Sequence, residues 1–313
     1  MDVAIIGLGL IGGSLLRALS AAGHRVHGYD ADPATREAAG ASTTTAEAAK
    51  NADLVVLAVP LPATDAVLTE LTTIGYDGLV TDVTSVKAPV RDLVGRRLAS
   101  ARFVGGHPMA GKETSGFAAA DPHLFEGCAW VLCLEAHTVL ADWLELAALY
   151  TGLGARVVPA TADEHDRAVA AVSHVPHLLA SALAARTATD RLAATLGAGS
   201  FRDGTRVAAS APRLTAAMCG GNARFVRDEL DAVLADLTAA RAALDRPDPI
   251  AALQPWLTTG WKARRNWPPQ PGPATELPAE ADELLRLGRA GGWVTAVAQD
   301  RRTVTAEVPF QRS

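Results

Sequence analysis

The chain contains little cysteine. Only three of its 313 residues are cysteines, and Cys128, Cys133 and Cys219 stand at no metal-ligand spacing. An odd number of thiols excludes a disulfide-stapled scaffold and favours a reducing compartment. We therefore expect a cytoplasmic protein.

Long apolar runs and an excess of basic residues are absent as well. No apolar run reaches the ~20 residues that a membrane-spanning helix needs, and no basic segment precedes the first apolar run as in a signal peptide. Lys and Arg number 29 against 34 Asp and Glu, a formal net charge of −5. A mildly acidic chain without a basic block is a poor nucleic-acid binder. The expected partner is a small molecule, with no nucleic acid and no membrane.

Several common catalytic signatures are also missing. The sequence contains no H-E-x-x-H segment, no G-x-S-x-G elbow and no Walker motif, and its cysteines lack a histidine at ligand spacing. We therefore expect neither a metal nor a serine nucleophile.

The first half of the chain alternates short apolar strands with helices. Apolar residues make up 49% of the sequence, enough to bury a sizeable core. Strands are expected at residues 3–6, 25–29, 54–59, 79–82, 103–105, 130–134 and 156–158, with a helix at 11–22 after the first. Strands without strict alternation, separated by helices, predict an α/β fold with a parallel sheet covered on both faces.

The second half is helical. Thr161-Ala162-Asp163-Glu164 has the form of a capping box, and no convincing strand follows before Arg246. An apolar stripe follows a 4-3-4-3-4 spacing: Val226, Leu230, Val233, Leu237, Ala240 and Leu244. The stripe predicts a long helix that packs on another helix, either inside a bundle or across a dimer interface.

These patterns divide the chain into three parts. We expect an α/β domain over residues 1–160, an all-helical domain over 161–246 and an extension over 247–313. Pro247-Asp248-Pro249 is expected to end the helical block, and residues 268–278 have the composition of a proline-rich linker. Residues 293–297 and 303–308 are candidates for a terminal hairpin.

A glycine-rich turn follows the first strand. Residues 7–12 fit G-x-G-x-x-G between a strand and a helix, the context that a dinucleotide-binding turn requires. Gly7 permits the tight turn, Gly9 lets a pyrophosphate approach the backbone, and Gly12 allows close helix–strand packing. The helix start at Leu10 and Ile11 offers N–H groups to the phosphates. The first domain is therefore predicted to be a Rossmann-type dinucleotide-binding domain.

Asp30 ends the second strand, 18 residues after Gly12. A carboxylate at this place accepts hydrogen bonds from the adenosine ribose hydroxyls and repels a 2′-phosphate, which predicts NAD in preference to NADP. Arg36 lies nearby and is interpreted as a solvated surface residue. A cation at this place would reduce the preference for NAD over NADP.

A histidine stands in a glycine-rich segment after the strand at 103–105. His107 lies between Gly106 and Pro108, and the segment continues to Gly116. Because α/β sheets bind ligands at the carboxyl ends of their strands, we expect this loop to present His107 to the site.

The chain resembles the prephenate and arogenate dehydrogenase family of tyrosine biosynthesis. The resemblance covers Met1 to about Arg246 and rests on blocks at residues 7–14, 84–87, 105–116, 173–177 and 201–206. It implies a C-terminal helical domain that forms a homodimer, and the NAD-dependent oxidative decarboxylation of prephenate to 4-hydroxyphenylpyruvate. The same chemistry on arogenate, or on an amino-prephenate, stays open.

The resemblance also implies roles for single residues. His107 would be the catalytic base, and Ser85 would hydrogen-bond it. Ser85 is also a candidate helix N-cap, and the two roles can coexist. Arg206 would hold a substrate carboxylate by a planar guanidinium fork. His177 would lie in the substrate pocket, and Pro176 should kink its helix. Two acidic residues, Glu113 and Asp203, would form an ionic network with the arginine.

Two other classes of protein compete with this interpretation. The β-hydroxyacid dehydrogenases use a lysine on the helical domain, but no lysine occurs from Glu113 to Trp261. A non-enzymatic NAD-binding module is disfavoured by the intact set of Ser85, His107 and Arg206. Thr215 stands where some family members carry a tryptophan, which leaves the choice of substrate open. The segment after Pro247 is too short for the regulatory domain of some relatives.

Overall fold

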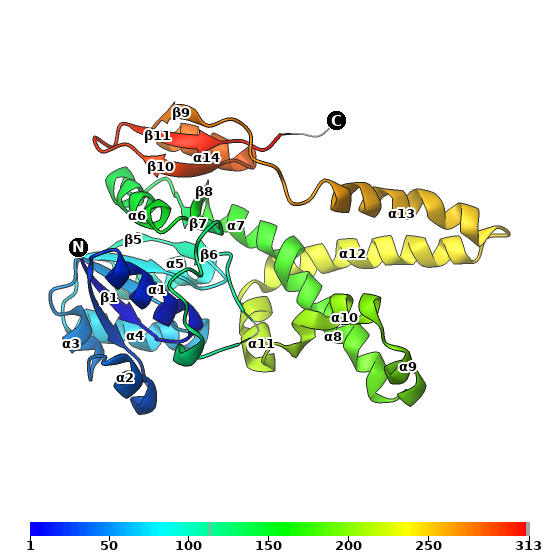
Figure 1. The fold of residues 1–313 in the computed structure, drawn as a ribbon, viewed down its shortest axis with the longest axis horizontal. Helices are drawn as coiled ribbons and strands as arrows, with labels where there is room; N and C mark the ends of the chain where they lie inside the picture. The colour runs from blue at the N-terminus through cyan, green and yellow to red at the C-terminus, as the bar shows by residue number, and fades with distance from the viewer. Residues whose placement is uncertain (113, 311–313) are drawn as a thin grey trace.

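The computed structural model describes residues 1–112 and 114–310. Figure 1 shows an α/β body at the N-terminus, a helical part that extends away from it, and a C-terminal unit of strands and one helix that lies against the α/β body. The predicted Glu113 lies outside the described residues.

Five parallel strands form the first sheet, in the order β2-β1-β3-β4-β5. Their bounds are β1 (Asp2–Ile6), β2 (Arg25–Tyr29), β3 (Leu54–Leu57), β4 (Leu79–Asp82) and β5 (Arg102–Val104). The helices of this region are α1 (Leu10–Ala21), α2 (Pro33–Ala39), α3 (Thr45–Ala49), α4 (Leu61–Thr73) and α5 (Ala88–Arg97). Successive residues of β1 enter two different apolar clusters, one on each face, so the predicted parallel sheet with two covered faces is confirmed.

The later strands belong to a second, mixed sheet, ordered β6-β7-β8-β10-β11-β9. Their bounds are β6 (Gly106–Pro108), β7 (Ala129–Cys133), β8 (Arg156–Ala160), β9 (Thr275–Pro278), β10 (Trp293–Val297) and β11 (Thr303–Glu307). Two helices accompany this sheet: α6 (Leu140–Gly152) and α14 (Ala281–Arg289). The assignment of β7 and β8 to the parallel sheet was therefore wrong, because β6 turns the chain around and pairs with β7 in the antiparallel sense.

The terminal hairpin expected at residues 293–308 is confirmed as β10 and β11. It extends the sheet of the N-terminal body, because β10 pairs with β8. The last four residues of the expected linker, 275–278, are not a linker, because they form β9 and pair with β11.

The helical part starts with the predicted capping box at Thr161. Its α-helices are α7 (Ala162–Val169), α8 (Val175–Ala185), α9 (Arg191–Leu196), α10 (Gly199–Thr205), α11 (Pro212–Gly221), α12 (Ala223–Leu244) and α13 (Pro249–Arg265). Three short elements complete it: the π-helical turn η2 (Ala170–His174) and the 3₁₀ turns η3 (Arg186–Ala188) and η4 (Arg206–Ala209). A further 3₁₀ turn, η1 (Phe117–Ala119), precedes β7. The disturbance expected at Pro176 takes the form of the π turn, after which Pro176 lies in the first turn of α8.

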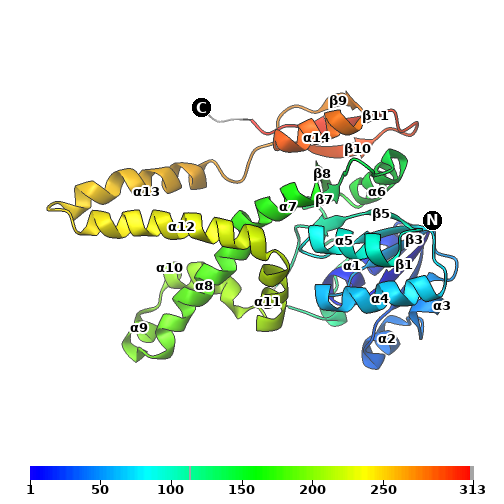
Figure 2. The ribbon, with the colours of Figure 1, turned by 180° about the vertical axis from the view of Figure 1, so that it is seen from behind.

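The prolines after residue 246 do not end the helical part. Asp248 caps a new helix, α13, and Pro249 occupies its first turn, where no N–H is needed. Helices α12 and α13 pack side by side in opposite directions and project away from the α/β body, as both views show (Figures 1 and 2).

Much apolar surface of the helical part is uncovered in a single chain. Several large apolar side chains are exposed there: Val172, Leu183, Leu192, Leu196, Leu234, Leu237, Leu244, Leu257 and Trp261. Of the predicted stripe, Val226, Leu230 and Val233 pack in the core, whereas Leu237 and Leu244 are exposed. One end of the stripe thus packs in the bundle, and the other end is exposed.

One expectation about hydrophobicity needs correction. The helical run Ala162–Ala188 is long and apolar enough, by length and composition, to cross a membrane, with a mean hydropathy of 1.5. A single helix of this kind is weak evidence for a membrane span, because the core helix of a soluble protein passes the same test. Buried titratable residues at its start, His165, Asp166 and His174, point to packing against protein.

Candidate active site

The glycine turn between β1 and α1 has the backbone that the motif predicts. Gly7 adopts a φ of +100°, and a Cβ there would lie 2.5 Å from the carbonyl oxygen of Ala58. A Cβ on Gly12 would lie 1.9 Å from the carbonyl oxygen of Gly7, so α1 can approach the turn only without that atom. Both glycines are therefore required by packing.

The turn is open where a dinucleotide would lie. A Cβ on Gly9 would meet no atom within 4 Å, and Gly9 caps α1 without any side-chain hydrogen bond. The cap residue Gly9 therefore offers no side-chain acceptor to the first N–H groups of the helix, at Leu10 and Ile11. Helix N-terminal N–H groups beside an open glycine fit a pyrophosphate.

Asp30 is connected directly to this turn. One carboxylate oxygen accepts a hydrogen bond from the Leu8 N–H at 2.7 Å, and the other accepts from the Asp32 N–H at 2.9 Å. Arg36 lies at the surface, as expected, but it is half-buried and hydrogen-bonded to the backbone. Its guanidinium donates to the carbonyls of Asp30 and Ala31 at 2.7 and 3.0 Å, and it lies over the Tyr29 ring.

His107 lies on β6 and not in a loop. The preceding Gly106 N–H donates to Oδ1 of Asp82 at 3.0 Å, and Asp82 is the last residue of β4. His107 therefore stands at the carboxyl edge of the parallel sheet, as expected, although its ring is partly buried.

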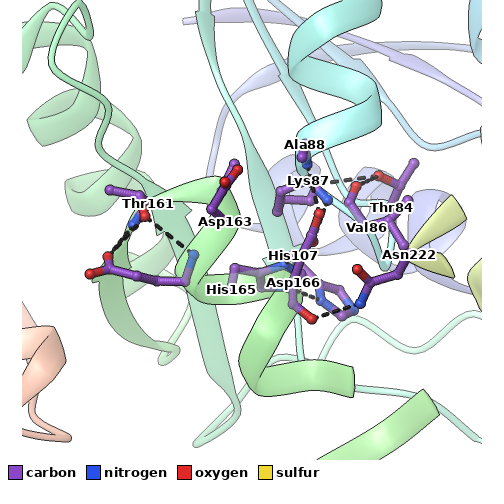
Figure 3. A network of polar contacts seen from close by, with 12 residues as sticks. Thr84, Val86, Lys87, Ala88, His107, Thr161, Asp163, His165, Asp166 and Asn222 are labelled. Atoms are coloured by element: carbon purple, nitrogen blue, oxygen red, sulfur yellow. Dashed lines mark hydrogen bonds and ion pairs between the residues drawn. The ribbon is translucent and has the colours of Figure 1, made fainter. Parts of the chain in front are cut away.

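A chain of three side chains runs inward from His107 (Figure 3). Nδ1 of His107 lies 2.8 Å from Nε2 of His165, and Nδ1 of His165 lies 2.8 Å from Oδ1 of Asp166. The two imidazole rings meet edge to face, with centroids 5.1 Å apart. His165 and Asp166 are buried.

Asp166, on α7, is held in place by two neighbouring helices. Its carboxylate accepts hydrogen bonds from the N–H groups of Lys87 and Ala88, at 2.8 and 2.9 Å, at the start of α5. The side chain of Asn222 donates to its main-chain carbonyl at 2.6 Å (Figure 3). Asp166 thus joins α5, α7 and the start of α12 around the same point.

A buried ion pair supports the strand that carries His107. Nζ of Lys87 pairs with Oδ2 of Asp82 and donates to the carbonyl of Gly106 at 2.5 Å. Asp82 also accepts a hydrogen bond from the Gly106 N–H, so both the N–H and the carbonyl of Gly106 are fixed. Removing either charged partner would leave a buried charge uncompensated.

The electrostatic surroundings keep the histidines neutral. Burial lowers the pKa of His107 well below its usual value, and the neighbouring His165 and Lys87 lower it further. Burial also lowers the pKa of His165, more than the hydrogen bond to Asp166 raises it. The pKa of Asp166 is below its usual value, because its hydrogen bonds outweigh the opposing effect of burial. At neutral pH the site therefore holds a carboxylate and two uncharged imidazoles.

Ser85 does not make the hydrogen bond that was expected. In the part of the chain that the structure describes, no hydrogen bond joins Ser85 to His107, whose Nδ1 is taken by His165. Ser85 is not an N-cap either, because Lys87 holds that position of α5. Ser85 is partly buried in the segment between β4 and α5.

The remaining predicted residues lie on neighbouring helices. His177 is on α8, where its Nδ1 bonds the Ser173 carbonyl at 2.9 Å. Arg206 begins η4 and Asp203 lies on α10, and both elements pack against α8. His174, one turn before His177, is completely buried, its Nδ1 is 3.1 Å from the Asn222 amide, and burial lowers its pKa to about 4.

Sequence reasoning missed the most closely connected residues. His165 and Asp166 directly follow the capping box, but nothing in the sequence links them to His107, 58 residues earlier. Lys87 stood in one of the blocks that carried the resemblance, yet no role was expected for it. Among residues 1–112 and 114–310, no group of three His, Cys, Asp or Glu side chains is placed to hold a metal ion.

Two family models match the chain. The nucleotide-binding domain of prephenate dehydrogenase matches residues 15–159, and the dimerization domain of prephenate dehydrogenase matches residues 161–257. The second match ends within α13, beyond the limit of the resemblance noted in the sequence.

Individual proteins agree with these models. A prephenate dehydrogenase of Bacillus subtilis is 33% identical over 79% of this chain and 71% of its own, and a cyclohexadienyl dehydrogenase of Zymomonas mobilis is 34% identical over 79% and 89%. A solved structure from Corynebacterium glutamicum, provisionally named a prephenate dehydrogenase, is 39% identical, with a TM-score of 0.77 over 85% of this chain and 88% of its own. A prephenate dehydrogenase from A. aeolicus, solved with hydroxyphenyl propionate and NAD⁺, is 26% identical, with a TM-score of 0.75 over 84% and 97%.

Proposed function

Because the chain belongs to the prephenate dehydrogenase family, we propose that it catalyses the NAD-dependent oxidative decarboxylation of prephenate to 4-hydroxyphenylpyruvate, a step of tyrosine biosynthesis. The observation that carries the proposal is the placement of a neutral His107 at the carboxyl edge of a nucleotide-binding sheet. A neutral imidazole at that edge is the group that hydroxyl oxidation needs.

The glycine turn and Asp30 would hold the cofactor. Leu10 and Ile11 present N–H groups to the pyrophosphate, and Gly9 leaves room for it. The Asp30 carboxylate, connected to the turn through Leu8, would bind the adenosine ribose. When bound, NAD⁺ supplies the acceptor for the hydride.

His107 would act as the general base. Its imidazole accepts the proton of the ring hydroxyl while the hydride leaves the same carbon. The carbonyl that develops draws electrons from the ring carboxylate, so CO₂ is lost and the ring becomes aromatic. Aromatisation makes the step effectively irreversible.

The carboxylates of the substrate need cationic partners. Arg206, on a turn that packs against α8, is proposed to bind one of them, and His177 on α8 is proposed to line the same pocket. Asp203 and Glu113 are proposed to orient the arginine. Ser85 is retained as a proposed site residue from its place beside α5, without the hydrogen bond first expected.

Arogenate is the second candidate substrate. Thr215, a small residue where some family members carry tryptophan, leaves the choice between the two substrates open. Arogenate has an amino group where prephenate has a keto group, and the reacting ring is the same. An amino-prephenate is a further variant of the same kind.

We also propose that the working form is a cytoplasmic homodimer. The family model over residues 161–257 describes a dimerization domain, and the apolar side chains exposed on that part of the chain need a cover. A second copy of the chain is the partner that such a domain implies.

The proposal is tested by a spectrophotometric assay of the purified full chain. NADH formation is followed at matched concentrations of prephenate and arogenate, and the aromatic product is identified by chromatography. Prephenate is expected to give NADH and 4-hydroxyphenylpyruvate in equal amounts. Failure of both substrates would defeat the proposed function, and turnover of arogenate alone would establish the second candidate.

A further inference from the structure

The side chains of Asp166, His165 and His107 are linked by hydrogen bonds, and these bonds fix the positions of their protons. Asp166 is a carboxylate that accepts from two backbone N–H groups, so Nδ1 of His165 must donate to it. A neutral His165 then has a bare Nε2, and that atom can only accept. The hydrogen bond of 2.8 Å between the two rings therefore needs a proton on Nδ1 of His107.

The proton on Nδ1 determines the state of the other ring nitrogen of His107, Nε2. A neutral imidazole carries one N–H, so Nδ1–H leaves Nε2 with a free lone pair. That lone pair is the feature that a general base requires. The alternative form, with the proton on Nε2, would leave His107 unable to accept the hydroxyl proton through that atom.

We propose that His165 and Asp166 are positioning residues that hold His107 as the Nδ1–H tautomer, with Nε2 free to accept a proton from the substrate. The role in turnover rests on the proposed function, whereas the tautomer itself does not. Figure 3 shows His107, His165 and Asp166 close together, with Asp166 on α7 beside the N–H groups of Lys87 and Ala88.

The low pKa values agree with this arrangement. Burial keeps His165 uncharged at neutral pH, which leaves its Nε2 as an acceptor. Asp166 keeps its negative charge, because its hydrogen bonds hold its pKa down. After Nε2 of His107 takes a proton, Nδ1–H of the cationic ring still donates to His165, and this charge-assisted bond stabilises the product of the transfer.

The geometry also shows why the pair is well suited to this task. The backbone N–H groups of Lys87 and Ala88, at the start of α5, hold the carboxylate of Asp166 beside His165. The Asn222 side chain fixes the main chain of Asp166 through its carbonyl. At the other end, Lys87 and Asp82 bind the backbone carbonyl and N–H of the buried Gly106 and so fix β6, which carries His107. Both ends of the hydrogen-bonded chain are therefore rigid.

The first test reads the tautomer without any substrate. Long-range ¹H–¹⁵N correlation spectra of the full chain distinguish a protonated Nδ1 from a protonated Nε2 for each histidine, and His107→Gln and His165→Gln assign the two signals. The proton is expected on Nδ1 in both rings at pH 8. A proton on Nε2 of His107 in the wild type would overturn the proposal, whatever the enzyme turns over.

The second test separates positioning from a purely structural role. His165→Leu removes the acceptor, so His107 should shift toward the Nε2–H form and kcat should fall by about 10- to 100-fold with little change in KM. His165→Gln offers an amide oxygen at the position of Nε2, so it should restore the Nδ1–H tautomer and most of kcat. Equal kcat in the wild type and in a folded His165→Leu variant would contradict the proposal. A loss of kcat in His165→Gln despite the restored tautomer would also contradict it.

A second histidine–carboxylate pair provides the control. His123 and Glu126 form a hydrogen bond of 2.6 Å that is exposed to solvent and outside the site. Glu126→Gln should leave kcat and the His107 tautomer unchanged. If neither prephenate nor arogenate reacts, the proposed function fails while the spectra still decide the tautomer.

Discussion

Oδ2 of Asp30 accepts a hydrogen bond from the Leu8 N–H at 2.7 Å, so the acidic residue after β2 is joined to the glycine turn after β1. The two signals that predicted a dinucleotide site, 18 residues apart, are therefore one structural unit. The carboxylate accepts one backbone hydrogen bond on each oxygen, from Leu8 and from Asp32. We propose that it also accepts hydrogen bonds from the ribose hydroxyls of the cofactor.

The first prediction concerns the choice of cofactor. Asp30→Ser should lower the affinity for NAD⁺ and narrow its advantage over NADP⁺, because the charge that repels a 2′-phosphate is lost and Arg36 stays nearby. The measurement is kcat/KM with each cofactor. Glu37→Gln, an exposed carboxylate on α2, is the control and should leave the ratio unchanged. A wild type that prefers NADP⁺ would contradict the assignment.

The second prediction separates the packing role of Gly12 from the binding role of Gly9. Gly12→Ala places a methyl group 1.9 Å from a backbone oxygen, so it should destabilise the fold by about 1–3 kcal/mol, the usual scale of overpacking. Gly9→Ala meets no atom and should keep the wild-type Tm, yet weaken NAD⁺ binding by about 10-fold or more, since the methyl group fills ligand space. Thermal unfolding and NAD⁺ titration decide both. If the Gly9→Ala variant binds NAD⁺ with wild-type affinity, the pyrophosphate lies elsewhere.

The third prediction concerns the base and its pH dependence. The neutral form of His107 is active, and its pKa is well below the usual value, so kcat should stay high down to a pH below ~6.5 and fall only as that lower pKa is passed. His107→Asn should reduce kcat by about 10²–10⁴-fold and remove this acidic limb. Profiles of kcat against pH test both statements. An acidic limb that persists unchanged in His107→Asn would assign it to another group.

The sequence predicted the parts of the fold that depend on local pattern. Buried strands such as β2 and β4, the capping box at Thr161 and the glycine turn each carry their signal within a few neighbouring residues. The second sheet was missed because it joins β8 to β10, more than 130 residues later, and no local pattern encodes that pairing. The helix α13 was missed because proline was interpreted as a stop, whereas Pro249 follows the capping residue Asp248 and starts a helix.

The site divides in the same way. His107, Asp30 and the glycines stand in motifs whose chemistry is readable from residue type and spacing. His165 and Asp166 act through hydrogen bonds across a domain boundary, and a histidine next to an aspartate on a helix is common in sequences without such a role. The expected partner of His107, Ser85, was taken from the resemblance, and the observed partner at Nδ1 is His165. Only the three-dimensional contact distinguishes the two.

The fourth prediction concerns assembly. Leu237 is 45% exposed on α12 within the part matched by the dimerization model. Leu237→Asp should give monomers or insoluble protein, because an unpaired carboxylate would be buried in the interface. Ile74→Asp, at an apolar position of similar exposure on the nucleotide-binding domain, is the control and should keep the wild-type mass. Sedimentation equilibrium measures both, and a monomeric wild type at micromolar concentration would contradict the interface.

The fifth prediction concerns Arg206. Its proposed partner, a substrate carboxylate, is present in both the ground state and the transition state, so its contribution should be mostly uniform binding. Charge-assisted hydrogen bonds contribute roughly 1.5–3 kcal/mol each, so Arg206→Ala should raise KM by about 10- to 10³-fold with a smaller change in kcat.

Two further variants make this test specific. Arg206→Lys should recover only part of the affinity, because an ammonium group cannot reproduce the planar fork of the guanidinium. Arg202→Ala removes an exposed cation four residues earlier on α10 and should leave KM near the wild-type value. Steady-state kinetics with prephenate and arogenate should give the same pattern, since both carry the ring carboxylate. If KM stays constant while kcat collapses, Arg206 acts on the transition state, and its assignment to substrate binding is wrong.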